Sequence, residues 1–184
     1  MPNVKGSALD ARFLWVQKHH GPAGLDKILR ALPAGDRAIH EAVILPSSWY
    51  PFATFVRVNE AIDRGFGTGD LTLVPQVARW AADANLPTLY KFFYQFGSVN
   101  FILGMGSRLW RMNYDAGALE VSAGDHVATV SIVDWPEPHR VHCLALGAWM
   151  SRCAEISGAT DVVLTEPSCR AKGDATCTFQ ITWR

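Results

Sequence analysis

Four cysteines, Cys143, Cys153, Cys169 and Cys177, are the residues whose type and spacing could do chemistry in this chain. Cys169 and Cys177 stand symmetrically about Gly173, close to the C-terminus. If the last two strands form a hairpin centred on that glycine, the two cysteines oppose each other, with Cβ atoms roughly 4.5–5.5 Å apart. This separation suits two metal ligands or a disulfide, but cysteine also packs readily as a small buried hydrophobe.

The other two cysteines lie on a helix predicted over residues 139–157. Ten positions separate Cys143 from Cys153, which is about 15 Å along a helix axis. A tetrahedral zinc with ligands at about 2.0–2.3 Å can therefore take only one of them. Glu166, three residues before Cys169, could add a carboxylate. One interpretation of this spacing is a zinc site with the ligands Cys143, Glu166, Cys169 and Cys177, and the other is that the hairpin cysteines pack as small hydrophobes. Cys153 is expected to pack in the core.

Composition restricts the classes of function. The chain has 184 residues, enough for one domain with a substantial core. Its 17 basic and 17 acidic residues leave no net charge, and no basic run could follow a phosphate backbone, so nucleic acid is not expected as a partner. The N-terminus lacks the pattern of a secretory signal, and no run approaches the roughly 20 apolar residues of a membrane span. We therefore expect a cytoplasmic protein with reduced thiols, which weakens the disulfide interpretation.

Residues 1–114 are predicted to be mostly helical. Leu9, Phe13 and Val16 share one face of a first helix, which Gly21 and Pro22 should end. Further helices are predicted over about 25–32, from 35, from Pro51 through Ile62, over 73–84, and from Gly97 to about Tyr114. Residues 45–51 contain too much proline to be helical. The cluster Gly65, Gly67 and Gly69 is not a nucleotide-binding motif, because no strand precedes it.

Residues 115–184 are predicted to form a hairpin, a helix and a second hairpin. Short β-branched runs surround Gly124 and Asp125, and two final strands are expected over about 160–168 and 176–183. The whole chain, residues 1–184, is therefore predicted to be a single α+β domain, in which a helical N-terminal half packs on an antiparallel sheet.

Aromatic residues exceed what a minimal core requires. Most of them are expected to be core, but some could line a cavity for a planar or acyl ligand, since such pockets are mostly apolar with few polar groups. Hydroxyl and indole groups add directional contacts. The candidate ligand-binding residues are Tyr94, Trp110, Tyr114, Trp135 and Trp149.

Histidines and hydroxyls do not form a recognisable catalytic motif. His139 and His142 lie three residues apart at a helix start, where capping or packing is the better interpretation. No nucleophile elbow, His-Glu-x-x-His motif or phosphate loop is found. The protein is therefore not expected to be an enzyme.

The ending from Cys169 to Phe179 resembles the signature of the 4-vinyl-reductase domain, and this resemblance covers residues 140–184. Over its full length the chain resembles an uncharacterised paralogous family of myxobacteria, through residues 4–9, 45–51 and 135–140. The first resemblance implies a phenol-like effector beside a structural zinc, held by Cys143, Glu166, Cys169 and Cys177.

The same broad fold class contains haem nitric-oxide-binding domains and Golgi-transport tethering subunits. The Tyr-x-Ser-x-Arg motif of the haem proteins is not found here, so haem is not expected. The resulting hypothesis is a bacterial small-molecule sensor or binding domain with an apolar pocket and a structural zinc. It would take a small apolar or aromatic ligand, with a homodimer as a possible assembly. One alternative is an interaction or dimerisation module without ligand, and a weaker one is an enzyme acting on a tetrapyrrole-like substrate.

Overall fold

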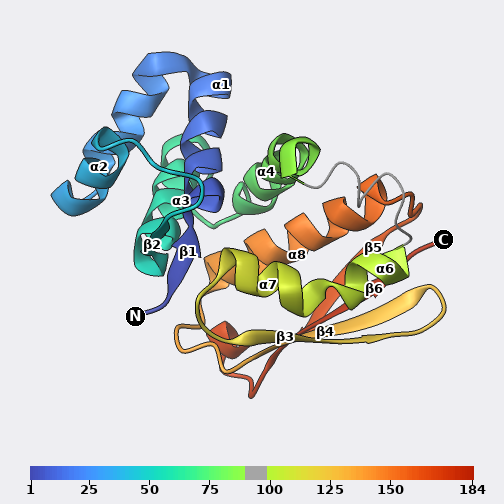
Figure 1. The fold of residues 1–184 in the computed structure, drawn as a ribbon. Helices are drawn as coiled ribbons and strands as arrows, with labels where there is room; N and C mark the ends of the chain where they lie inside the picture. Colours follow the sequence, from blue (N-terminus) through green and yellow to red (C-terminus); the bar gives the residue numbers. More distant parts are fainter. Residues whose placement is uncertain (90–98) are drawn as a thin grey trace.

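Helices make up most of the N-terminal part of the chain (Figure 1). The computed structural model describes residues 1–89 and 99–184, with side chains for all of these except 85–89 and 100–102. The helices found in this part are α1 (Gly6–Ala31), α2 (Ala34–Glu41), α3 (Phe52–Phe66), α4 (Val74–Leu89), α6 (Val99–Gly104) and α7 (Gly106–Asn113). None of the described helices is long and apolar enough to cross a membrane.

The first helix breaks where the sequence predicts. Gly21 has φ 65° and ψ −170°, which is not helical, and Pro22 follows it, so α1 is two helical segments joined at a kink. In the first segment Leu9, Phe13 and Val16 are buried, and the segment packs against α3. The predicted start of α3 is also confirmed, because Pro51 directly precedes its first residue.

The prediction of one continuous helix from Gly97 to Tyr114 is wrong. The chain forms two helices, α6 and α7, which are separated at Met105. At Gly106 a Cβ atom would lie 2.8 Å from a methyl group of Val121, so α7 starts where the backbone approaches the sheet closely. The helical periodicity of the sequence could not predict this close approach of Gly106 to Val121.

A small two-stranded sheet near the N-terminus was not predicted. Strands β1 (Asn3–Lys5) and β2 (Trp49–Pro51) pair antiparallel. Val4 also forms an isolated bridge with Tyr114, and Asn3 donates two hydrogen bonds, of 2.6 and 2.7 Å, to the carboxylate of Asp115. The start of the chain is thereby joined to the end of α7.

The main sheet has four antiparallel strands in the order β3-β4-β6-β5. They are β3 (Ala118–Ala123), β4 (Val127–Val133), β5 (Val163–Ser168) and β6 (Cys177–Thr182). Between the two hairpins runs α8 (Arg140–Ile156), and Figure 1 shows α7 and α8 on the same face of the sheet. The α+β prediction is confirmed, with helices on an antiparallel sheet.

One hydrophobic cluster joins both parts of the chain. It includes Leu9 and Phe55 from the N-terminal helices, Trp110 from α7, and Val130 and Phe179 from the sheet. Along β4 and β6 the buried residues alternate with more exposed ones, as expected for a sheet with a single covered face. The covered face is the one that contributes to the candidate site.

Candidate functional site

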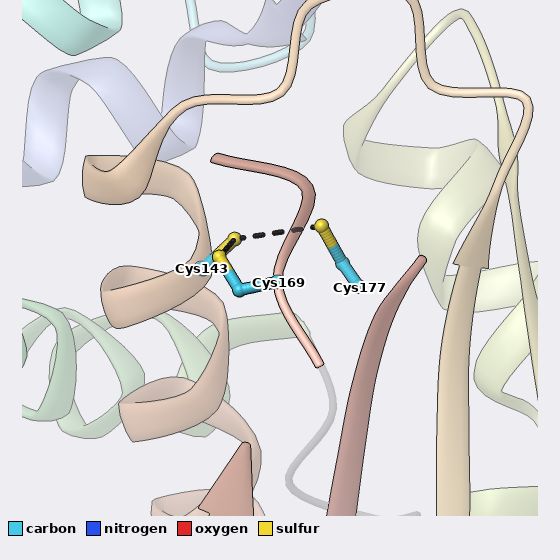
Figure 2. A group of neighbouring side chains, drawn as sticks. All are labelled: Cys143, Cys169 and Cys177. Atoms are coloured by element: carbon cyan, nitrogen blue, oxygen red, sulfur yellow. Dashed lines mark hydrogen bonds between the residues drawn. The ribbon is translucent and has the colours of Figure 1, made fainter. Parts of the chain in front are cut away.

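Three of the four cysteines converge where α8 meets the last hairpin. Ser168 pairs with Thr178 after a register shift in β5, so Cys169 and Cys177 directly flank the loop that turns at Gly173 (φ 100°). Cys143 approaches from the first turns of α8. Figure 2 shows the three side chains pointing toward one another.

The sulfur atoms are close but not bonded. The Cys143 sulfur lies 3.6 Å from that of Cys169 and 3.8 Å from that of Cys177, and all three lie within 4.8 Å of one another. A disulfide would require about 2.05 Å, so these are three thiols, each 1–3% exposed. Burial is the main reason that the pKa of Cys143 is raised, and its two neighbouring cysteines add to the effect. Cys153 lies in a different apolar cluster, with Ala82 and Leu109.

Glu166, the fourth predicted ligand, lies near the thiols but is not one of the atoms within that 4.8 Å group. Its Oε2 accepts a hydrogen bond from Arg140, whose Nη1 also lies 3.6 Å from the Cys169 sulfur. The other oxygen, Oε1, is buried and has no hydrogen-bond partner among the described residues. The structure therefore gathers three of the predicted ligands and leaves Glu166 bound to Arg140.

A second feature is an apolar cavity of about 340 Å³ between the helices and the sheet. Of the predicted ligand-binding residues, Trp110, Tyr114 and Trp149 line it. Tyr94 lies outside the described residues. Apolar side chains from several elements complete the walls, among them Phe55, Leu103, Leu109, Leu119, Val121, Val130, Ala145, Leu146 and Met150.

Trp135 is not among the lining residues but belongs to an aromatic cluster around His142. The ring centroids of Tyr114 and Trp135 lie 4.9 and 5.0 Å from that of His142. His142 is 1% exposed, and its Nε2 finds no partner in the described part of the chain. Burial lowers the pKa of this imidazole to about 3, with a smaller effect from His139. The expectation of capping or packing for His139 and His142 agrees with the structure, since His142 is buried and His139 accepts a hydrogen bond from the amide of Val141 at the start of α8.

Charge in the cavity has one sign. The charged side chains among the described lining residues are Lys5 and Arg12, and no carboxylate or imidazole lines the cavity. Burial lowers the pKa of Arg12 to about 10, which still leaves it cationic at neutral pH. Burial raises the pKa of Tyr114 to about 12, against an opposing effect of the Arg12 charge, so the phenol keeps its proton.

Arg12 is the site residue that the sequence interpretation missed. Its signal was its position, because Arg12 is three residues after Leu9 and therefore on the same face as Leu9, Phe13 and Val16. A basic residue on the apolar face of an amphipathic helix contradicts the pattern that buries that face. Such a contradiction marks a candidate functional position.

Comparison with known proteins gives a clear result only at the level of structure. No protein-family model matches the chain, and no curated protein does. Among solved structures, an H-NOX protein from S. oneidensis in the Fe(II)NO ligation state superposes with a TM-score of 0.74, at 10% identity over 98% of this chain and 99% of that one. An oxygen-binding H-NOX domain related to soluble guanylate cyclases gives 0.69, at 10% identity over 98% and 95% of the two chains. An unliganded Fe(II) H-NOX protein from K. algicida gives 0.71, at 12% identity over 98% and 96%.

These comparisons correct two predictions. The resemblance to the 4-vinyl-reductase domain and to a myxobacterial family is wrong as a recognition, because the structural neighbours are H-NOX proteins and no family model matches. The prediction of zinc without haem is also overturned. Structures with this fold include one solved to study how porphyrin distortion changes haem redox potential, with a TM-score of 0.65 at 9% identity. A missing sequence motif was therefore no reason to set haem aside.

Proposed function

We propose that this protein is a small-molecule sensor or binding domain whose ligand occupies the apolar cavity. The cavity carries this proposal: its volume of about 340 Å³ falls in the range of roughly 300–1,000 Å³ typical of ligand pockets. Its walls are apolar apart from a few polar groups, among them Arg12 and the Tyr114 hydroxyl, as expected for a site that binds by burial and orients by polar contacts. No reaction is assigned to it.

The shared fold supports the same class of function. The similar H-NOX structures hold iron-bound nitric oxide or oxygen, so this arrangement of helices and sheet can enclose a ligand in other proteins. At 10–12% identity, the likeness indicates the fold, and the ligand has to be argued from the residues of this chain.

Haem is the first ligand to test against those residues. Haem iron in proteins is held by His, Cys, Met or Tyr. All six histidines of the chain lie in its described part, and none lines the cavity. Tyr114 keeps its proton because its pKa is raised to about 12. Cys153, Met112 and Met150 also line the cavity and are of types that can ligate iron, but the described lining offers no histidine and so does not fit a histidine-ligated haem.

Native mass spectrometry of the purified protein, followed by titration with an environment-sensitive apolar dye, tests the proposal. We expect retained small molecules or saturable dye binding in the wild type. Ala145→Trp, which fills the cavity from α8, should abolish both. Ala23→Trp, at an exposed position of α1, is the matched control and should bind as the wild type does.

An empty wild-type protein that binds no dye and is always dimeric would contradict the proposal. That result would support the alternative function, an interaction or dimerisation module whose cavity serves no ligand.

We also propose that Cys143, Cys169 and Cys177 form a site for a metal ion that prefers thiolate ligands. The supporting observation is the convergence of three buried sulfurs within 4.8 Å of one another, since thiolates are the ligands that such metal ions prefer. Elemental analysis of protein purified without chelator should find about one equivalent of bound metal. Cys177→Ser should abolish it, and Cys153→Ser should not change it. Metal-free wild type would refute the site.

A further inference from the structure

Arg12 is a buried cation without a counter-ion. The side chain belongs to a residue that is 4% exposed. All 17 acidic residues of the chain lie in its described part, and none of them forms an ion pair with Arg12. Buried charges in proteins are normally paired, because an unpaired charge loses its hydration without compensation. The fold thus holds a positive charge that nothing in the chain neutralises.

The contacts of Arg12 leave much of the guanidinium unused. Its Nη1 donates to the Ala8 carbonyl at 2.9 Å, and its Nε makes a long contact of 3.5 Å with Oδ1 of Asn59. The guanidinium carbon lies 4.6 Å from the centre of the Phe55 ring. A guanidinium has five N–H donors, and Nη2 donates to no described residue. Because Arg12 lines the cavity, its unused donors are available to a carboxylate bound there.

Two further groups that line the cavity favour an anion. Tyr114 also lines the cavity, and its phenol carries a proton that it can donate. Lys5 adds a second positive charge and is itself held in place, since its Nζ donates to the Ser47 carbonyl at 2.8 Å and lies over the Trp49 ring. Both Lys5 and Ser47 line the cavity, and Lys5 is partly exposed, so it can attract an anion from solvent.

The rest of the cavity is apolar. Leu109, Leu146 and Trp149 from α7 and α8, together with Val121 and Val130 from the sheet, offer no charged partner. A ligand that matches the whole site must carry one anionic group and an extended apolar body. A simple inorganic anion would leave the apolar walls unused, and a neutral hydrocarbon would leave Arg12 uncompensated.

We propose that the ligand is an apolar carboxylic acid of the fatty-acid class, whose carboxylate binds between Arg12 and the Tyr114 hydroxyl while its chain fills the apolar cavity. This inference rests on the ligand-binding function proposed above and names the class of molecule that the same cavity takes. Arg12 and Tyr114 are then binding residues, and Lys5 attracts the carboxylate to the entrance.

The test compares two probes of equal length, dodecanoate and dodecanol, by calorimetric titration of protein from which bound lipid has been extracted. Wild type should bind dodecanoate at least tenfold more tightly than dodecanol. Arg12→Met should weaken dodecanoate binding by about 10- to 100-fold, the usual effect of losing hydrogen bonds to a charged group, and should leave dodecanol binding unchanged. Tyr114→Phe should weaken dodecanoate binding less. Arg30→Met, an exposed arginine of the same helix, is the matched control.

Three outcomes decide between this inference and the function on which it rests. Equal affinity for both probes, or an Arg12→Met variant that binds dodecanoate normally, overturns the carboxylate proposal while the pocket function stands. Failure of wild type to bind dodecanoate, dodecanol or haemin overturns both. A parallel titration with haemin separates the two sources of a carboxylate. If haemin binds and dodecanoate does not, the fatty-acid assignment is wrong.

Discussion

Asp36 and Arg12 are both 4% exposed charged residues in the helical part of the chain, yet their surroundings differ. The Asp36 carboxylate accepts hydrogen bonds from Nε and Nη2 of Arg57, at 2.5 and 2.8 Å, and from the Thr54 hydroxyl at 2.7 Å. The Arg12 guanidinium instead contacts the Ala8 carbonyl, the more distant side-chain oxygen of Asn59 and the ring of Phe55. The same helices thus hold one neutralised and one uncompensated charge.

The difference separates charges that serve the fold from charges that serve a ligand. Asp36 joins the start of α2 to α3 through Thr54 and Arg57, so its partners come from the structure itself. Burying a charge without a partner costs free energy, because its lost hydration is not compensated. The burial of Arg12 is therefore a cost to the fold, which makes sense if its counter-ion arrives with a ligand.

The largest effect is expected from breaking the compensated pair. Arg57→Met should lower the free energy of unfolding at pH 7 by about 2.5 kcal/mol, because it leaves the buried Asp36 carboxylate without its cation; the effect is smaller than for a fully buried pair because the Arg57 side chain is 41% exposed. Hydrogen bonds from Arg57 are the main reason that the pKa of Asp36 is lowered from 3.8. Asp36 therefore stabilises the fold above that value, and the stabilisation is lost as the pH falls through the lowered pKa. Urea unfolding should show that the free energy of unfolding falls less between pH 7 and pH 3 in the variant than in wild type. An equal loss in both would contradict this account.

The buried neutral imidazole of His142 should have an intermediate effect, on the pH dependence of the free energy of unfolding. The unfolded chain protonates a histidine near pH 6.5, whereas folded His142 protonates only near pH 3. Between these values the unfolded state therefore binds one proton more than the folded state. The free energy of unfolding falls by about 1.4 kcal/mol for each unit by which the pH is lowered. Between pH 7 and pH 5, His142→Phe should lose about 2 kcal/mol less stability than wild type in chemical unfolding. Identical pH dependence would show that His142 gains a partner when folded.

The smallest effect has the opposite sign. Arg12→Met in the ligand-free protein should raise the free energy of unfolding by about 1 kcal/mol, because it removes an uncompensated buried charge. For a chain of this size that corresponds to a rise of about 3 °C in Tm, measurable by calorimetry beside Arg57→Met. A fall in Tm as large as that of Arg57→Met would mean that Arg12 is structural, and the contrast with Asp36 would disappear.

Much of the fold was predictable from local signals. The break at Gly21, the start of α3 after Pro51 and the hairpin around Gly124 follow from glycine, proline and turn chemistry that act within a few residues. The convergence of Cys169 and Cys177 followed from hairpin symmetry about Gly173. The length of a helix showed that only one of Cys143 and Cys153 could join them. The expectation that Cys153 packs in the core, together with the family resemblance, favoured Cys143, and the structure brings Cys143 to the other two.

What could not be predicted depends on contacts between distant segments. The break between α6 and α7 reflects the approach of Gly106 to Val121. The bond of Glu166 to Arg140 joins β5 to α8. Trp135 was expected at the ligand and instead packs around His142. The sequence shows that Arg12 is a basic residue on the apolar face of the first helix. Only the structure shows that no carboxylate of the chain pairs with it.

The bridge between Val4 and Tyr114 has a mechanical consequence. Tyr114 is at once a wall of the cavity and a partner of the first strand, and the neighbouring pair Asn3 and Asp115 reinforces the connection. A ligand that moves the backbone at Tyr114 must also break this bridge or move the first strand with it. That strand pairs with β2 and contains Lys5, which also lines the cavity. Two lining residues that are far apart in the sequence, Lys5 and Tyr114, are thus coupled through one short strand, and a backbone displacement at Tyr114 would be transmitted to β2.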